Sequence, residues 1–127
     1  MRRALAGLMV AAVAGAGLVG LREATQNRAD PAREGTATEL TLEVRTRGDY
    51  PALLAAQGLW GVCQQTVSDN RLRHPLAEAG AGRFTVAVEP ALGRHATRRL
   101  RGCLEDATVP RVSGRVAGQR DLVLSVP

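Results

Sequence analysis

The sequence predicts an α+β fold that follows an apolar N-terminal segment. Three observations lead to this prediction. Several stretches alternate apolar and polar residues with the period of two that is typical of half-buried strands. Two other stretches repeat apolar residues at the helical steps of three and four, and residues 4–21 contain no charged side chain. The chain of 127 residues has room for one domain besides that segment.

Residues 1–22 are predicted to be either a transmembrane anchor or a signal peptide. Arg2 and Arg3 precede the apolar run of residues 4–21, and Arg22 closes it. As a helix this run would span about 27 Å, which is enough to cross the hydrocarbon core of a bilayer. A signal peptide would instead be cleaved at a small-x-small site, for example at residues 12–14.

Both interpretations place residues 23–127 outside the cytoplasm, because the two N-terminal arginines favour retention of the N-terminus inside. We therefore expect a single-pass protein of the cell membrane that contacts the lipid bilayer through residues 4–21. If the segment is cleaved, we expect a secreted protein. A third interpretation, a buried helix of a soluble protein, would need a large apolar partner surface that the rest of the sequence does not offer.

The next part of the chain is predicted to be a flexible linker of residues 23–37 followed by a domain of residues 38–127. The linker mixes charged residues, Pro, Gly and Ala without apolar periodicity. The domain begins with a predicted strand, TELTLEVRTRG, in which Leu40, Leu42 and Val44 alternate with polar residues.

A helix is predicted in the stretch DYPALLAAQGLWGVCQQTV, with Asp49 as its N-cap. Gly58 and Gly61 weaken this helix, or allow another element to pack closely against it. Its apolar stripe consists of Ala52, Ala56, Leu59, Cys63 and Val67, with Trp60 beside it.

Two strands, a second helix and a last strand are predicted to follow. Leu72, His74 and Leu76 alternate in the first of these strands, and a turn at residues 79–82 leads to the strand RFTVAVEP. The stretch GRHATRRLRGCLEDA is an amphipathic helix in this prediction, and the strand GRVAGQRDLVLSV, bulged at Gly118, ends the chain. The apolar stripe of the second helix consists of Ala96, Leu100, Cys103, Leu104 and Ala107.

This order of elements predicts a ferredoxin-like βαββαβ sandwich, in which one antiparallel sheet carries both helices on a single face. Right-handed crossovers place the two helices side by side on that face. Cys63 and Cys103 both lie on apolar stripes, so they would point into the same layer between helices and sheet.

Two cysteines in an exported protein favour a structural disulfide between Cys63 and Cys103. Two separate buried thiols are an alternative. A redox pair would typically have C-x-x-C spacing, and the two histidines, His74 and His95, show no spacing typical of a zinc site with the cysteines. We therefore expect no metal site and no cofactor.

The net charge of +5 does not indicate a nucleic-acid-binding protein. All 17 basic residues are Arg, and the only aromatic residues are Tyr50, Trp60 and Phe84. Proteins that bind nucleic acids usually combine a concentrated basic face with aromatic side chains that stack on bases. We therefore expect no nucleic-acid partner.

The second predicted helix carries the densest basic cluster of the chain. Arg94, His95, Arg98 and Arg101 could contact an anion or an acidic partner, with help from the helix N-terminus near Gly93. The alternative is an ordinary solvated helix face, partly neutralised by Glu105 and Asp106.

No catalytic residues are predicted. The serines lack a G-x-S-x-G context, and Glu105 and Asp106 are neighbours that would point apart on a helix. The chain is therefore expected to be a binding or accessory domain that contacts another envelope protein, rather than an enzyme. The alternative function is that of a small-anion-binding protein or hydrolase that uses the Arg-rich helix and His95.

The segments DYPALLAAQGLWGVCQQTV and FTVAVEPALG…RRLRGCLEDATVPRV resemble a group of uncharacterised exported or single-pass proteins of GC-rich bacteria. The resemblance covers residues 40–112. It implies the same ferredoxin-like domain and the same pair of cysteines, and it implies no activity.

Overall fold

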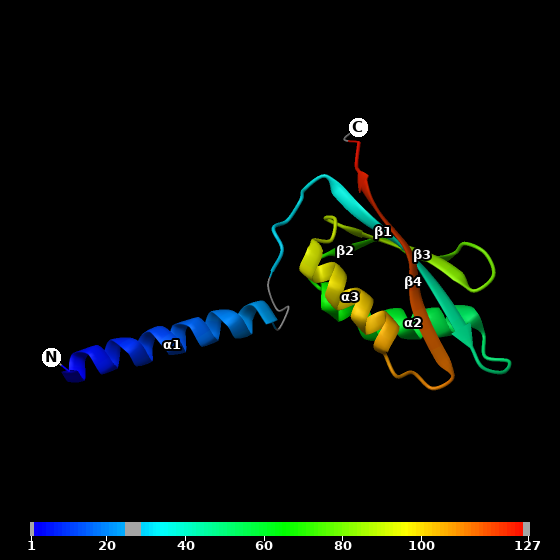
Figure 1. Ribbon diagram of the computed structural model, residues 1–127. Coiled ribbons are helices and arrows are strands. Elements are labelled where there is room, and N and C mark those ends of the chain that lie inside the picture. Colours follow the sequence, from blue (N-terminus) through cyan, green and yellow to red (C-terminus); the bar gives the residue numbers. More distant parts are fainter. Residues whose placement is uncertain (1, 25–28, 126–127) are drawn as a thin grey trace.

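The computed structural model describes residues 2–24 and 29–125. The N-terminal segment forms helix α1 (Arg2–Ala24), which Figure 1 shows in blue. Among the described residues, no helix combines the length and the apolarity that crossing a membrane requires. The predicted transmembrane anchor is therefore not confirmed.

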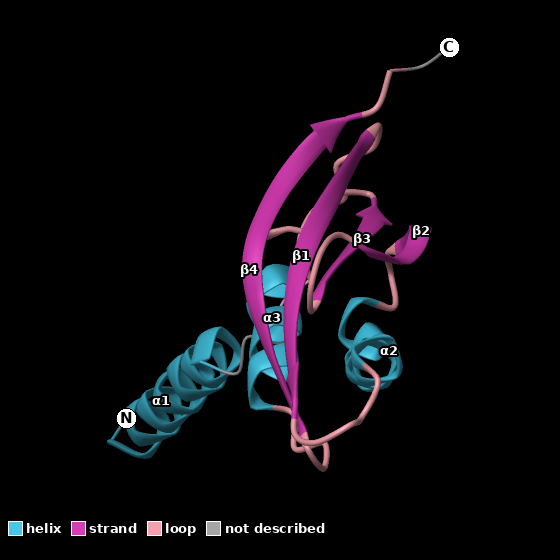
Figure 2. Ribbon diagram, turned by 90° about the vertical axis from the view of Figure 1, so that its right-hand side faces the viewer, coloured by secondary structure: helices cyan, strands magenta, loops and turns pink. Residues whose placement is uncertain are grey.

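A four-stranded antiparallel sheet forms the domain, with the strands in the order β2-β3-β1-β4. Figures 1 and 2 show the two helices of the domain, α2 and α3, on one side of this sheet. The predicted α+β fold with an antiparallel sheet is confirmed, and so is the alternation of strands and helices along the chain. The elements are β1 (Thr36–Thr46), α2 (Ala52–Cys63), β2 (Arg71–Glu78), β3 (Arg83–Glu89), α3 (Arg94–Asp106) and β4 (Val112–Val123).

The core lies between the sheet and the two helices. Side chains alternate across a strand, and on β1 the even-numbered residues Leu40, Leu42 and Val44 are buried. Both predicted helical stripes also enter this core: α2 contributes residues such as Leu59, and α3 contributes residues such as Leu100. The largest fully buried side chain is that of Phe84 on β3.

Helix α2 begins and ends differently from the prediction. Its N-cap is Pro51 rather than Asp49, and no side chain caps it. The chain tightens after Cys63 into a 3₁₀ turn, η1 (Gln64–Val67), so the α-helix is shorter than predicted. Val67 is nevertheless buried, because the 3₁₀ turn still directs it toward the core.

The predicted alternation of Leu72, His74 and Leu76 on one face of β2 is wrong. Leu72 lies opposite Val88 of β3, but His74 lies opposite the next residue, Ala87, because the register shifts between them. This irregularity moves His74 to the other face of the sheet from Leu72. Such a bulge inserts one additional residue into β2 relative to β3. The sequence does not reveal it, because the inserted residue is of a type that is common at any position of a strand.

The bulge predicted near Gly118 on β4 is confirmed. Thr41 of β1 pairs with Gly118, whereas the next residue, Leu42, pairs with Val116. Another glycine of β4, Gly114, lies beneath the helices: a Cβ atom there would be 2.8 Å from the carbonyl oxygen of Leu104. Any larger residue would therefore push α3 away from the sheet.

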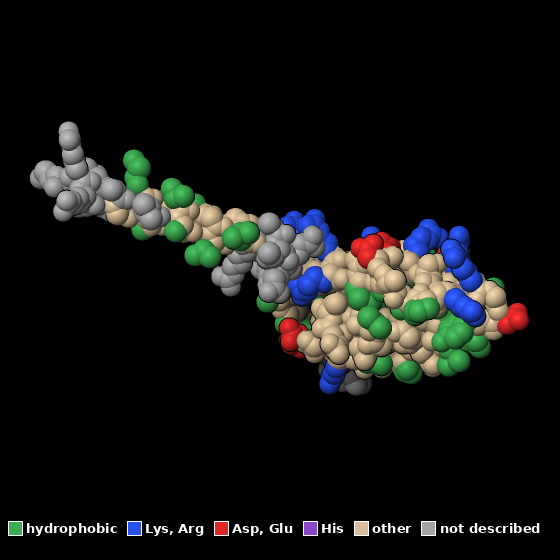
Figure 3. All heavy atoms as spheres, turned by 90° about the horizontal axis from the view of Figure 1, so that it is seen from below, with side chains coloured by type: hydrophobic (Ala, Val, Ile, Leu, Met, Phe, Trp, Pro, Cys, Tyr) green, Lys and Arg blue, Asp and Glu red, His purple; other side chains and the backbone are tan. Residues whose placement is uncertain are grey.

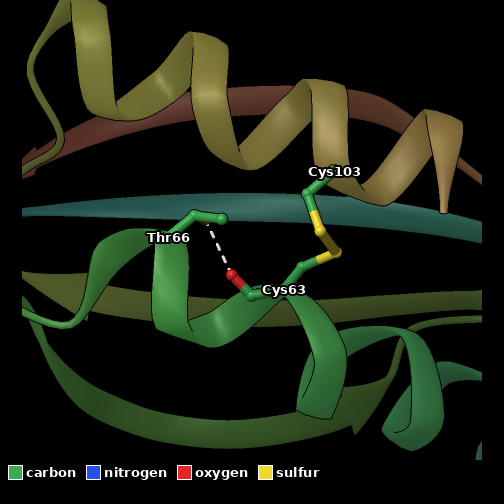
Figure 4. Close-up of a disulfide and its surroundings, with 3 residues drawn as sticks. All are labelled: Cys63, Thr66 and Cys103. Carbon is green, nitrogen blue, oxygen red and sulfur yellow. Dashed lines mark hydrogen bonds between the residues drawn. A yellow bond between two sulfur atoms is a disulfide. The ribbon is translucent and has the colours of Figure 1, made fainter. Parts of the chain in front are cut away.

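The predicted disulfide between Cys63 and Cys103 is confirmed, with a Cα–Cα distance of 5.6 Å. Figure 4 shows that it joins the last turn of α2 to α3. The hydroxyl of Thr66 donates a hydrogen bond of 2.7 Å to the carbonyl oxygen of Cys63, which connects the end of α2 to the 3₁₀ turn (Figure 4). The disulfide thus ties together the two helices that cover the sheet.

Candidate functional site

The face of the sheet that points away from the helices, called the open face below, carries a network of arginines and glutamates. On β1 it consists of the odd-numbered residues, because the even-numbered ones enter the core. The strand registers place six arginines and three glutamates on this face within the described residues. They are Arg45, Arg71, Arg73, Arg83, Arg115, Arg120, Glu39, Glu43 and Glu89.

Glu43, in the middle of one end of the open face, accepts hydrogen bonds from two arginines. Arg115 of β4 lies 2.8 Å from it and Arg45 of β1 lies 3.2 Å from it. Hydrogen bonding to Arg115, and to a lesser extent to Arg45, holds the pKa of Glu43 below its ordinary value. Arg83 of β3 lies directly across from Glu43 in the strand register. We call Glu43, Arg45 and Arg115 the Glu43 cluster.

Glu89, at the other end of the open face, is also shared between two arginines. Arg73 donates to it at 3.0 Å, and Arg71 of the same edge strand donates to it as well. The hydrogen bonds from Arg73 and Arg71 hold the pKa of Glu89 below its ordinary value. We call Glu89, Arg71 and Arg73 the Glu89 cluster.

Each cluster borders a hollow in the surface. The hollow at the Glu89 cluster has a volume of about 470 Å³ and extends to Glu34 and Ser125. The hollow at the Glu43 cluster has a volume of about 430 Å³. Both clusters are therefore open to a ligand from solvent.

The middle of the open face is less charged than its two ends. Thr41 pairs with Thr85 there, and Glu39 lies opposite the buried Ala87. Arg120 of β4 forms an ion pair of 2.7 Å with Glu39. Each glutamate of the open face is thus paired with at least one arginine, and the arginines are in excess.

The opposite side of the domain differs in character. Figure 3 shows a surface with exposed apolar side chains and few charges toward the viewer, and arginine and acidic side chains along its upper edge. Helix α2 contains no charged residue. Its exposed residues include Leu53, Leu54 and Val62.

The predicted anion-contact residues of α3 do not converge on one site. Arg94 and Arg98 are exposed, and Arg101 lies 3.7 Å from Glu105 in the i, i+4 pair that the helix pattern suggests. His95 instead turns toward the protein, where its Nδ1 atom is buried and has no hydrogen-bond partner among the described residues.

The N-terminus of α3 is occupied by a carboxylate of the chain itself. The oxygens of Asp30 accept hydrogen bonds from the backbone N–H of Ala96 at 2.7 Å and from that of His95 at 3.2 Å. Partial burial opposes ionisation of Asp30, but these two hydrogen bonds outweigh it and lower its pKa. Gly93 makes room for the contact, since a Cβ atom there would lie 2.2 Å from the Cβ of Asp30.

Residues 29–35, called the strap below, are held to the domain at a second point. Arg33 donates to the carbonyl oxygen of Leu92 and to the carboxylate of Asp121, at 3.1 Å and 2.7 Å. The other oxygen of Asp121 accepts a hydrogen bond from the fully buried hydroxyl of Thr38. The last part of the predicted flexible linker is therefore bound to the domain, whereas residues 25–28 lie outside the described residues.

No metal centre is formed by the part of the chain that the structure describes, in which no three His, Cys, Asp or Glu residues lie close enough to hold an ion. The two cysteines are bonded to each other. The histidines lie apart, His74 on the open face and His95 at the start of α3.

The arginines and glutamates of the open face are not predicted as a site from the sequence. The signal was present in the polar positions of the predicted strands, where Glu39, Glu43 and Arg45 recur at every second or fourth residue. The sequence does not show which strands are neighbours in the sheet. The pairing of Glu43 with Arg115, for example, joins residues that are 72 positions apart.

Comparison with known proteins gives no match: no family model, no curated protein and no solved structure shows significant similarity to this chain.

Proposed function

We propose that this chain is an extracytoplasmic binding domain that docks onto another envelope protein through its open face. The N-terminal segment delivers the domain across the cell membrane, either as a retained anchor or as a cleaved leader. Two arginines followed by a long uncharged run support this role for the segment. The disulfide between Cys63 and Cys103 supports it too, because disulfides persist in oxidising compartments.

The domain is ferredoxin-like in this proposal. The order of elements along the chain and the strand order β2-β3-β1-β4 support the assignment, since they correspond to two interleaved strand–helix–strand units. In such an arrangement the helices cover one face of the sheet and leave the other free. A free face built on strands is a rigid platform for a partner.

The single observation that carries the proposal is the composition of the open face. An antiparallel sheet with one solvated face commonly shows scattered polar residues there. Here the face carries six arginines and three glutamates, and five of these arginines form ion pairs with the glutamates, either across adjacent strands or between residues two apart on one strand. Since surface ion pairs contribute little to stability, typically about 0–1 kcal/mol each, binding is a better explanation for this density of arginines.

The test is co-purification of partners from solubilised envelopes with two matched charge-reversal variants. In the first variant Arg71, Arg73 and Arg115 of the open face are changed to Glu. In the second, Arg94, Arg98 and Arg101 of α3 are changed to Glu, which alters the net charge equally. We expect the first variant to lose a partner that the wild-type protein and the second variant both retain.

Loss of the partner only in the α3 variant would contradict the proposal. That result would favour the alternative function, in which the Arg-rich helix and His95 bind an anion or a substrate. Thermal unfolding of both variants shows whether each is still folded.

A further inference from the structure

Resting on the function proposed above, we infer that the open face binds an extended acidic segment of the partner protein. The Glu43 cluster and the Glu89 cluster each take one end of that segment. The inference follows from the unused donors of the arginines, from the distance between the clusters and from the absence of a net charge on the surface between them.

In each cluster a glutamate positions the two arginines but does not use all of their N–H donors. A guanidinium group has five N–H donors, and a carboxylate shared by two arginines uses only some of them. In each cluster two positive charges surround one negative charge, so a net positive charge remains. At the Glu43 cluster, Arg83 across the register adds a further positive charge.

The two clusters are separated by a length that suits a peptide. Glu43 lies opposite Arg83 of β3, and Glu89 lies six residues further along the same strand. At about 3.3 Å per residue this corresponds to about 20 Å. An extended acidic peptide of about seven residues spans this distance, whereas a single small anion does not.

The centre of the face favours a segment with spaced charges over a phosphate polymer. Thr41, Thr85 and Ala87 carry no charge there, and the ion pair of Glu39 with Arg120 has no net charge, so a continuous row of phosphates gains little at the centre. Among the described residues, no Phe, Trp or Tyr lies on this face to stack on bases, since Phe84 and Trp60 are buried in the core and Tyr50 lies in the loop before α2. Carboxylates suit the planar donor fork of arginine, which binds them in pairs of hydrogen bonds.

The test measures binding of fluorescein-labelled glutamate peptides to the full-length protein by fluorescence anisotropy. One peptide has twelve residues, with four glutamates at each end and four serines between them, and spans both clusters; the other has four glutamates and reaches only one. Since two linked contacts act at a high effective concentration, we expect the longer peptide to bind at least tenfold more tightly. Changing Arg71 and Arg73 to Gln should abolish most of this advantage while altering binding of the short peptide about twofold.

The matched control changes Arg94 and Arg98 of α3 to Gln, which removes the same charge from the other side of the domain. We expect this control to change the affinity for the long peptide less than twofold. Equal affinities for the two peptides, or an equal loss in the control variant, would overturn the inference. Tighter binding of a twelve-nucleotide thymidylate than of the long peptide would overturn it too, in favour of a phosphate polymer.

These results are separate from the test of the proposed function. If the charge-reversal variant of the open face loses the partner but the glutamate peptides do not bind, the open face is the docking surface. The inference that the partner contributes an acidic segment is then wrong. If co-purification depends on α3 instead, the proposed function itself is wrong.

Discussion

At the scale of single residues, the contact of Asp30 with the start of α3 explains why a carboxylate at position 30 and a glycine at position 93 go together. A helix N-terminus leaves backbone N–H groups without partners, and a nearby carboxylate satisfies them and interacts favourably with the helix dipole. The helix has no cap from its own N-cap residue, Gly93, which has no side chain. Asp30 supplies the cap from 65 positions away, and it can do so only because Gly93 leaves the space free.

Changing Gly93 to Ala is therefore expected to expel Asp30 from the helix terminus. The cost should be about 1 kcal/mol of unfolding free energy, as for the loss of other N-caps. Chemical unfolding of the single variants and the double variant with Asp30→Ala measures the coupling. Because Asp30→Ala already removes the cap, Gly93→Ala should cost little in that background. Additive effects would show that the two residues do not act through each other.

The stability that Asp30 provides should depend on pH. Its pKa is lowered in the folded protein, so its contribution is fully present above its ordinary pKa of about 4 and is lost as pH falls through the lower folded value. Asp30→Asn keeps a capping oxygen but not the charge. We expect this variant to melt about 3 °C below the wild type at pH 6, and the difference to shrink as pH falls below the ordinary pKa of Asp30. A difference that grows on acidification would contradict the assigned sign.

The sequence alone could predict which residues pair only where few pairings were possible, as for the disulfide. Two cysteines permit one pairing, and apolar stripes placed both in the same layer, so Cys63 and Cys103 were matched correctly. The cap by Asp30 could not be predicted, because it joins a segment without periodicity to a helix far along the chain. The same segment was predicted to be flexible, since nothing in its composition shows the contacts of Arg33 with Leu92 and Asp121.

At the scale of elements, the disulfide fixes the relation between α2 and α3. Helix α2 has no side-chain cap at its N-terminus and two exposed glycines, so it is intrinsically weak. The covalent bond to α3 and the burial of residues such as Leu59 compensate for this weakness.

Removing the disulfide should strongly destabilise the domain. For a separation of 40 residues, the chain-entropy model gives a loss of roughly 4 kcal/mol, a large share of the 5–15 kcal/mol typical of small domains. Denaturant unfolding of the Cys63→Ser/Cys103→Ser variant, compared with the oxidised wild type, measures this loss. An unchanged midpoint would show that the bond contributes nothing to stability.

The elements themselves were predictable to different degrees. The stripes of α2 and α3 and the alternation on β1 and β3 follow from burial against one core, so their periodicity located them. On β2 the register shifts twice, and the predicted common face for Leu72 and His74 was therefore wrong. The predicted last strand GRVAGQRDLVLSV ends at Val126, which lies outside the described residues, whereas β4 ends at Val123.

At the scale of the whole molecule, the two sides of the domain differ in how their surfaces are built. One side presents the open face, where arginines exceed glutamates, and the other presents the apolar exterior of α2 beside the arginines of α3. From the sequence, the basic partner surface is predicted on α3, because the arginines there are close together along the chain, whereas the open face is assembled from four strands.

Photo-crosslinking in cells that produce the protein distinguishes the open face from α3 as the docking surface. A photoreactive amino acid is placed at Thr41, in the centre of the open face, or at the exposed Arg98 of α3. We expect a discrete adduct with a partner protein from position 41 and none from position 98. An adduct from position 98 with none from position 41 would contradict the claim that the open face is the docking surface.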